Sequence, residues 1–213
     1  MDETDEIFTE ELDAHGDAAE SAVVLALTAL YAANNQPSEE QIRNAISGVM
    51  VPYLLAILIL LSTVSSDTGE TAQMDFYQVA EELSAEAADL LSTELANMTR
   101  QMNRDPNTRG FDGTDFRARM TSLVAAVLTI VTSQAMMHLA RLLGFRFKVW
   151  KTRLDVRVRL SHQSLEGQMV PLNSVFRDYR KIPIEYPGDR STPIDMWINC
   201  RCRLGFSRRG EDA

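Results

Sequence analysis

Cysteine is scarce in this chain of 213 residues, which contains only Cys200 and Cys202. One residue separates them, too few for an unstrained disulfide, and two cysteines cannot form a disulfide scaffold. The opening residues, MDETDEIF, are acidic and lack the positively charged start of a secretory signal peptide. We therefore expect the protein in a reducing compartment, or in a particle that is assembled in one.

Basic residues are almost absent from the first half. Residues 1–99 contain 19 Asp and Glu but a single basic residue, Arg43, whereas residues 100–213 contain 20 Lys and Arg against 11 Asp and Glu. The net charges are therefore −18 and +9, and −9 overall. The overall negative charge argues against nucleic-acid binding, but the basic second half makes such binding a hypothesis to keep.

The chain also lacks a clean membrane span. Ala22–Ala33 and Val49–Leu61 are shorter than the roughly 20 residues that cross a bilayer, and no Lys or Arg clusters flank them. The third apolar stretch, Leu123–Ala140, is interrupted by polar residues: Thr129, Thr132, Ser133, Gln134 and His138. We expect three buried helices and no membrane partner.

Local signals predict helix over most of residues 1–144. Ser38 and Gln41 fit the S-x-x-Q capping box, so a helix should begin near Glu39, and Pro52 should kink or divide it. Apolar residues at helical spacing predict another helix that ends at Asp105-Pro106. These are Phe76, Ala80, Leu83, Ala87, Leu90, Met98 and Met102.

A further helix should run from about Asp115 to Leu143 and stop at Gly144. The polar segments Ser65–Thr71 and Asn107–Thr114 should form loops.

The pattern changes at Phe145. Phe145, Phe147 and Val149 alternate with Arg146, Lys148 and Trp150, which is typical of a half-buried strand. Later segments are short and separated by turn residues such as Pro187-Gly188-Asp189. The sequence therefore predicts an α+β fold in two domains. Residues 1–144 form an acidic region of about four helices for anchoring or assembly, the last leading out, and residues 145–213 form a basic, β-rich α+β module.

Four polar residues early in the module are candidates for chemistry: Asp155, Arg157, Arg159 and His162. Asp155 and Arg159 share a face whether this run is extended or helical. One interpretation is that Asp155 anchors Arg157 or Arg159 and so holds a loop. The other is a polar site in which His162 acts as an acid or base, or contacts a phosphate, although no nucleophile accompanies it.

The C-x-C pair has two interpretations as well. Cys200 and Cys202 with His162 and Asp155 would supply four zinc ligands, and a small module gains stability from a metal. The usual spacing in structural zinc sites is C-x₂₋₄-C, however, and alternate positions of a strand equally suit two small buried side chains.

Non-specific contact with DNA phosphates is a further hypothesis for the basic module. The candidate residues are Arg146, Lys148, Lys151, Arg153 and Arg203. The alternative is a solvated face, or salt bridges to the acidic half. Sequence-reading DNA motifs and the common enzyme motifs are absent, so we expect no catalytic residues.

An ordered set of residues gives the module a resemblance. The run WKTRLDVRVRLSHQSLEGQMVPL (150–172) precedes Phe176, then YPGD (186–189) and INCRC (198–202). Together they resemble the phage Mu F-like minor head proteins, the phage head morphogenesis family, over roughly the last third of the chain. The family pattern falls on Trp150, Asp155, Arg157, Arg159, His162, Gly167, Pro187, Asp189, Asn199, Cys200, Arg201 and Cys202.

The resemblance implies a minor structural component of the head of a tailed double-stranded DNA phage or prophage. Its partners would be the portal protein, the major capsid protein and, non-specifically, double-stranded DNA. It would lie in the head interior or at the portal vertex after assembly in the host cytoplasm. Where relatives often carry an R-T-E-like motif before the strand, this chain has apolar residues and Ser133-Gln134. The alternative is a small nuclease or toxin-like enzyme that uses His162 with Arg157 or Arg159, near Asp155, on a phosphodiester.

Overall fold

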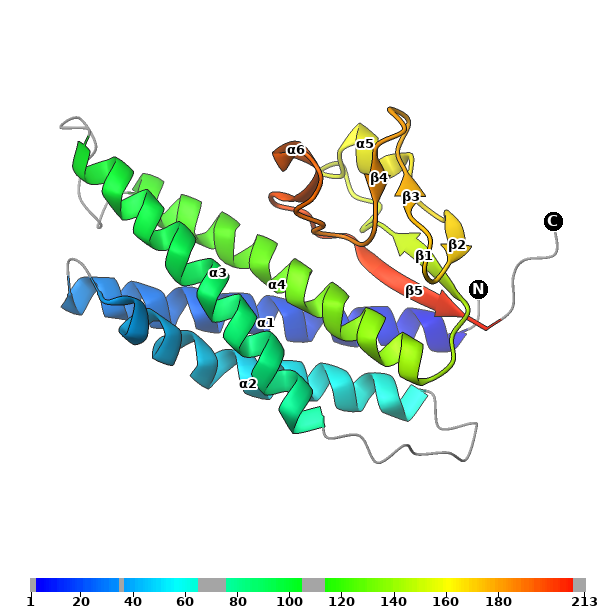
Figure 1. Cartoon of the computed structure of the whole chain (residues 1–213), viewed down its shortest axis with the longest axis horizontal. Coiled ribbons are helices and arrows are strands. Elements are labelled where there is room, and N and C mark those ends of the chain that lie inside the picture. Colours follow the sequence, from blue (N-terminus) through cyan, green and yellow to red (C-terminus); the bar gives the residue numbers. More distant parts are fainter. Residues whose placement is uncertain (1–2, 35–36, 65–75, 105–113, 209–213) are drawn as a thin grey trace. The chain divides into compact units, whose positions relative to one another are not determined.

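Four long helices precede a small antiparallel sheet in the computed structural model, which describes residues 3–34, 37–64, 76–104 and 114–208 (Figure 1). The α+β prediction is confirmed. The helices are α1 (Glu3–Ala33), α2 (Glu39–Val64), α3 (Phe76–Arg104) and α4 (Thr114–Leu142). The predicted loops at 65–71 and 107–113, and the Asp105-Pro106 helix end, lie outside the described residues.

The start of α2 follows from its capping box. The backbone N–H of Ser38 donates to Gln41 Oε1 at 2.9 Å, and the N–H of Gln41 donates to Ser38 Oγ at 3.2 Å. These reciprocal bonds satisfy two N–H groups that the first helical turn leaves free, so the helix begins at Glu39 as predicted. Pro52 lies inside α2, which continues through it to Val64.

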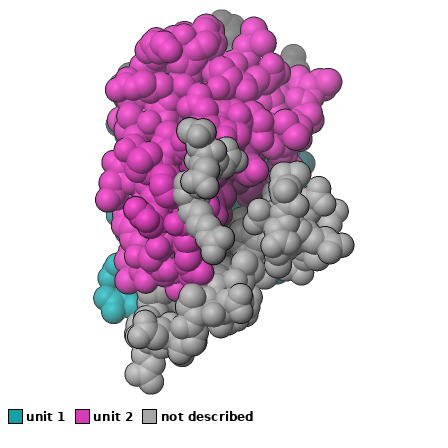
Figure 2. Space-filling view, turned by 90° about the vertical axis from the view of Figure 1, so that its right-hand side faces the viewer, with its two compact units in different colours: residues 1–128 teal, residues 129–213 magenta. Residues whose placement is uncertain are grey.

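The chain forms two compact units, residues 1–128 and residues 129–213, coloured separately in Figure 2. In unit 1, α2 packs against both α1 and α3. Its buried residues recur at helical spacing: Ile42, Ile46, Met50, Leu54 and Leu58. The edge of Tyr31 in α1 meets Phe116 in α4, with ring centroids 5.1 Å apart. The lone basic residue of the acidic half, Arg43, pairs with Asp89.

Among the described residues, two helices are long and apolar enough, by length and composition alone, to cross a membrane. One is Phe116–Leu142, of which 78% is buried, as in the core helix of a soluble protein. The other is Ala14–Ala33, where the helix extends the expected stretch Ala22–Ala33 and only 22% is buried.

Unit 2 begins with the last part of α4 and continues into short elements: β1 (Phe147–Lys151), α5 (Leu160–Gln163), β2 (Met169–Pro171), β3 (Phe176–Arg177), β4 (Pro183–Ile184), α6 (Ile194–Trp197) and β5 (Arg203–Ser207). The strands form an antiparallel three-stranded sheet in the order β2-β1-β5 and a separate β3-β4 pair. The register places Trp150 opposite Leu204.

The units divide within α4, earlier than the expected boundary at residue 144. The reason is a set of bonds from this helix to the C-terminal loops. Thr129 Oγ1 donates to the carbonyl of Cys200 at 2.7 Å, and Ser133 Oγ donates to the carbonyl of Pro187 at 2.9 Å. Residues 129–142 therefore belong to the module, and Ser133 has a structural partner there.

Gly188 permits the close approach of this loop to α4, and alanine there should be strongly destabilising. Its φ is +91°, and an added Cβ would lie 2.9 Å from Ile130 Cγ1 and 3.2 Å from its Cα. We expect Gly188→Ala to lower the free energy of unfolding by about 2–4 kcal/mol in urea titrations. Gly144→Ala is the matched control, because Gly144 also has positive φ but has open space around it. Equal losses in the two variants would contradict the close approach.

Strand β1 alternates as predicted, but its fully buried face is the one that carries Lys148 and Trp150, while Phe147 and Val149 on the apolar face are only half-buried. Lys148 Nζ donates to the carbonyl of Glu185 at 2.8 Å and lies 5.3 Å from the centroid of the Phe176 ring. A side chain without solvent exposure cannot reach a phosphate, so the prediction of Lys148 as a DNA contact is wrong.

The buried lysine predicts a specific pH dependence. Burial lowers the pKa of Lys148 from 10.5 to about 8, so the unfolded chain binds more protons than the folded chain between these pH values. The free energy of unfolding should therefore rise from about pH 8 to about pH 10.5, relative to that of Lys148→Met. Urea unfolding of both proteins across this range checks it, and parallel pH profiles would contradict it.

Candidate metal centre

His162, Cys200 and Cys202 meet in the core of unit 2. His162 comes from α5, Cys200 follows α6, and Cys202 directly precedes β5. His162 Nδ1 lies 3.7 Å from Cys200 Sγ and 3.3 Å from Cys202 Sγ, and all three side chains are buried. Their ligand atoms lie within 4.8 Å of one another, close enough to share a metal ion.

A backbone carbonyl determines which imidazole nitrogen faces the sulfurs as a ligand. His162 Nε2 lies 2.9 Å from the carbonyl oxygen of Met196 in α6. A carbonyl only accepts hydrogen bonds, so Nε2 carries the proton and Nδ1 presents its lone pair toward both sulfurs. Metal-binding histidines usually donate their second ring N–H in this way.

The two thiols change each other's pKa through a hydrogen bond between them. A hydrogen bond from Cys202 lowers the pKa of Cys200. The same bond, together with burial, raises the pKa of Cys202, while the indole of Trp150 acts in the opposite direction. One proton is thus lost readily from the pair. A thiolate beside an imidazole lone pair is a donor set that suits zinc.

Trp150 forms a wall of the cluster. It is fully buried, and its ring lies edge-on to His162 and to Phe176, with centroids 5.8 and 5.2 Å away. Its Nε1 is buried and has no hydrogen-bond partner in the described structure. The indole lies close enough to Cys202 to lower the pKa of that thiol.

Asp155 is not part of the group, so its prediction as a metal ligand is wrong. Its carboxylate accepts two hydrogen bonds from Arg201, at 2.9 and 2.8 Å, and one from the backbone N–H of Arg157 at 2.9 Å. Arg201 accordingly lowers the pKa of Asp155. The interpretation that Asp155 holds a loop is therefore right, but the side chain that it binds is that of Arg201 and not that of Arg157 or Arg159.

The arginines of the enzymatic alternative do not gather at the histidine. The guanidinium of Arg159 donates to the carbonyl of Ile198, and Arg157 is exposed. His162 is buried, and both of its ring nitrogens face protein atoms.

Three other residues that carry the family resemblance, Gly167, Asn199 and Asp189, have structural roles. Gly167 and Asn199 have φ of +73° and +52°, in the left-handed region that these two residue types tolerate. The buried carboxylate of Asp189 accepts the backbone N–H groups of Glu185 at 2.8 Å and Ser191 at 2.9 Å. Asp189 thereby holds the turn that contains Gly188.

Sequence reasoning missed Met196, whose carbonyl orients His162, and Asp178, which holds a turn by accepting hydrogen bonds from Arg180 and from the backbone N–H of Ile182. Met196 acts through its backbone carbonyl, which no residue type signals. Burial raises the pKa of Asp178, but hydrogen bonds from Arg180 and from the backbone N–H of Ile182 outweigh burial and leave that pKa low. An Asp that bonds backbone two residues later is a common turn pattern and was the available signal.

The remaining DNA-contact candidates differ in exposure. Arg146 is exposed, and Lys151 and Arg153 are half-buried. Arg203 is sufficiently enclosed that burial lowers its pKa to about 10, which disfavours a phosphate contact. Arg146 is the candidate best placed to reach DNA.

No protein-family model, curated protein or solved structure matched the chain in our comparisons.

Proposed function

We propose that the protein is a minor head protein of a tailed double-stranded DNA phage or prophage, with a structural role and no turnover. The observation that supports this is that the residues which carry the family resemblance form the core of unit 2 or join its loops. Trp150, His162, Cys200 and Cys202 are core residues, and Asp155 and Arg201 join two loops. Residues of a catalytic site would instead leave reactive groups open to a substrate.

The charge distribution supports the same proposal. An acidic helical region suits docking on a basic portal or capsid surface. The basic module suits the packaged genome, where a high phosphate concentration populates even weak contacts. Arg146 is the exposed candidate for such contacts.

We further propose that the His162, Cys200 and Cys202 cluster supplies three of the four ligands of one structural zinc ion. Two buried sulfurs and one oriented imidazole nitrogen are zinc's preferred donors. The ion would join α5 to the segment that links α6 with β5, in a module whose strands have at most five residues. A metal supplies stability that so small a core lacks.

Quantitative mass spectrometry of purified virions tests the head-protein proposal. We expect a low, reproducible number of copies per particle, calibrated against the major capsid protein of the same sample. A cytoplasmic host protein is the control for carry-over. A chain that stays in the lysate and is depleted from virions as strongly as that control would contradict the proposal.

A further inference from the structure

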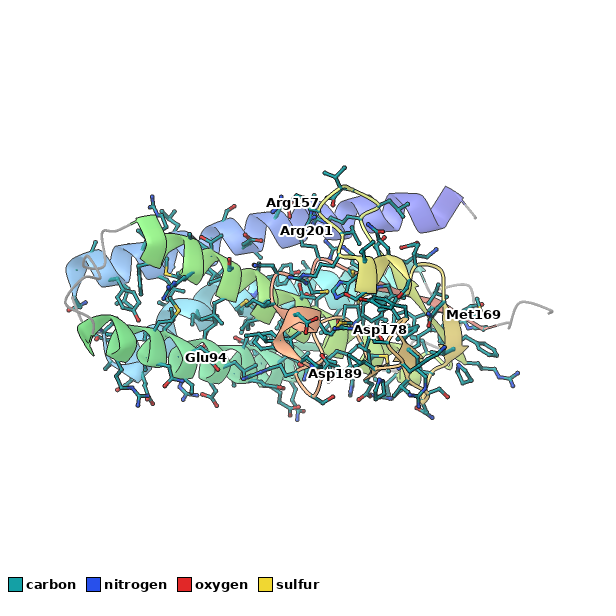
Figure 3. All side chains as sticks on the ribbon, turned by 90° about the horizontal axis from the view of Figure 1, so that it is seen from above. Glu94, Arg157, Met169, Asp178, Asp189 and Arg201 are labelled. Carbon is teal, nitrogen blue, oxygen red and sulfur yellow. The ribbon has the colours of Figure 1, made fainter. Side chains whose placement is uncertain are left out.

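The loop between β1 and α5 exposes three apolar side chains to an unusually large extent. Leu154 is 78% exposed, Val156 101% and Leu160, at the start of α5, 74%. Arg157, which is labelled in Figure 3, is exposed on the same loop. Single exposed apolar residues are ordinary, but three of them within seven positions of one loop indicate an interaction surface.

This loop is fixed in place by its polar residues. Asp155 binds Arg201 and the N–H of Arg157, and Arg159 binds the carbonyl of Ile198. Leu154 has a φ of +52°, which a leucine rarely adopts. Strained backbone persists where the surrounding structure imposes it, frequently at functional sites. The hydrogen bonds of the loop therefore hold these apolar side chains in solvent, in a fixed arrangement that a partner can bind.

The chemistry of the loop specifies a partner that is both apolar and acidic. Helix α1 of the same chain has this character. It contains eight acidic residues and no Lys or Arg. Leu25 is 69% exposed on it, and most of the apolar segment Ala14–Ala33 is uncovered.

We propose that the loop at residues 152–160 of one copy docks on α1 of a second copy. The contact joins two different surfaces, so it is heterologous and builds a ring or a filament rather than a twofold dimer. Leu154, Val156 and Leu160 supply the apolar contact, and Arg157 pairs with acidic residues of α1. The proposal requires no phage component and is independent of the proposed function.

Sedimentation velocity of the full-length protein over a range of concentrations tests the contact. We expect self-association that Val156→Asp weakens about tenfold, because burial of a valine is lost and a charge is added. Val156 is fully exposed, so its replacement leaves the fold intact. Ile194→Asp is the matched control, an exposed apolar residue outside the loop, and should associate like the wild type.

Cross-linking then identifies the partner surface. A photoreactive benzoylphenylalanine at position 156 is introduced, and equal amounts of ¹⁵N-labelled and unlabelled protein are mixed. Cross-links of mixed label into residues 3–33 support the proposal. A monomer at all concentrations, cross-links within one label only, cross-links elsewhere on the chain, or equal effects of Val156→Asp and Ile194→Asp would each overturn it.

Discussion

Replacing both Cys200 and Cys202 with serine should eliminate metal from the protein and unfold much of unit 2. We expect the wild-type chain to purify with one zinc ion, and the double variant to contain none. Structural zinc contributes on the order of 10 kcal/mol to folding of small domains, far more than packing of two thiols. Metal analysis by plasma mass spectrometry, with thermal melts followed by circular dichroism, measures both effects.

Two controls separate loss of metal from loss of packing. A strong chelator should lower the melting temperature of the wild type and leave the double variant unchanged. The double variant Cys200→Ala with Cys202→Ala removes the ligands without burying hydroxyl groups. If the wild type bound no metal, this variant should lower the free energy of unfolding by only about 1–3 kcal/mol. Wild-type protein that contains no zinc and melts identically with chelator would show that the cysteines are merely packed.

Trp150→Ala should produce the second large effect, a loss of about 3–5 kcal/mol in the free energy of unfolding. The side chain is fully buried against Phe176 and His162, so its removal leaves a cavity beside the cluster. Urea titration followed by far-ultraviolet circular dichroism measures the loss. Trp197→Ala is the control, because that half-buried ring faces Arg190 at 5.5 Å and should cost much less.

Trp150→Phe separates the ring from its N–H group. Most of the packing remains, but the donor beside the Cys202 sulfur is lost. We expect zinc affinity to fall about 10–100-fold, as for other groups that orient metal ligands, with a smaller change in stability. Competition with a chromogenic chelator measures it. Unchanged affinity would show that the indole N–H does not act on the sulfur.

The parts of the fold that the sequence predicts well are those decided by neighbouring residues. The capping box of Ser38 and Gln41 determines the start of α2, and Gly144 follows the end of α4. The alternation of β1 is visible in its own residues. Each signal lies within a few positions of the structure that it produces.

Features that depend on distant residues were mistaken or missed. Asp155 binds Arg201, 46 positions away, instead of the arginines beside it. The buried face of β1 contains Lys148 because the Glu185 carbonyl, 37 positions later, accepts a hydrogen bond from its ammonium group. The carbonyl of Met196 orients His162 from 34 positions away. The ligand types of the candidate site were therefore predictable, whereas the partners that orient them were not.

Helix α4 belongs to both units, and this limits how the C-terminal module can be moved between proteins. A gene exchange that joined residues 145–213 to another chain would leave the carbonyls of Cys200 and Pro187 without the hydroxyl donors Thr129 and Ser133. It would also uncover the loop around Gly188, which packs on Ile130. The transferable segment must carry about four turns of α4 with it. Recombination therefore keeps the module intact only where the junction falls upstream of Thr129.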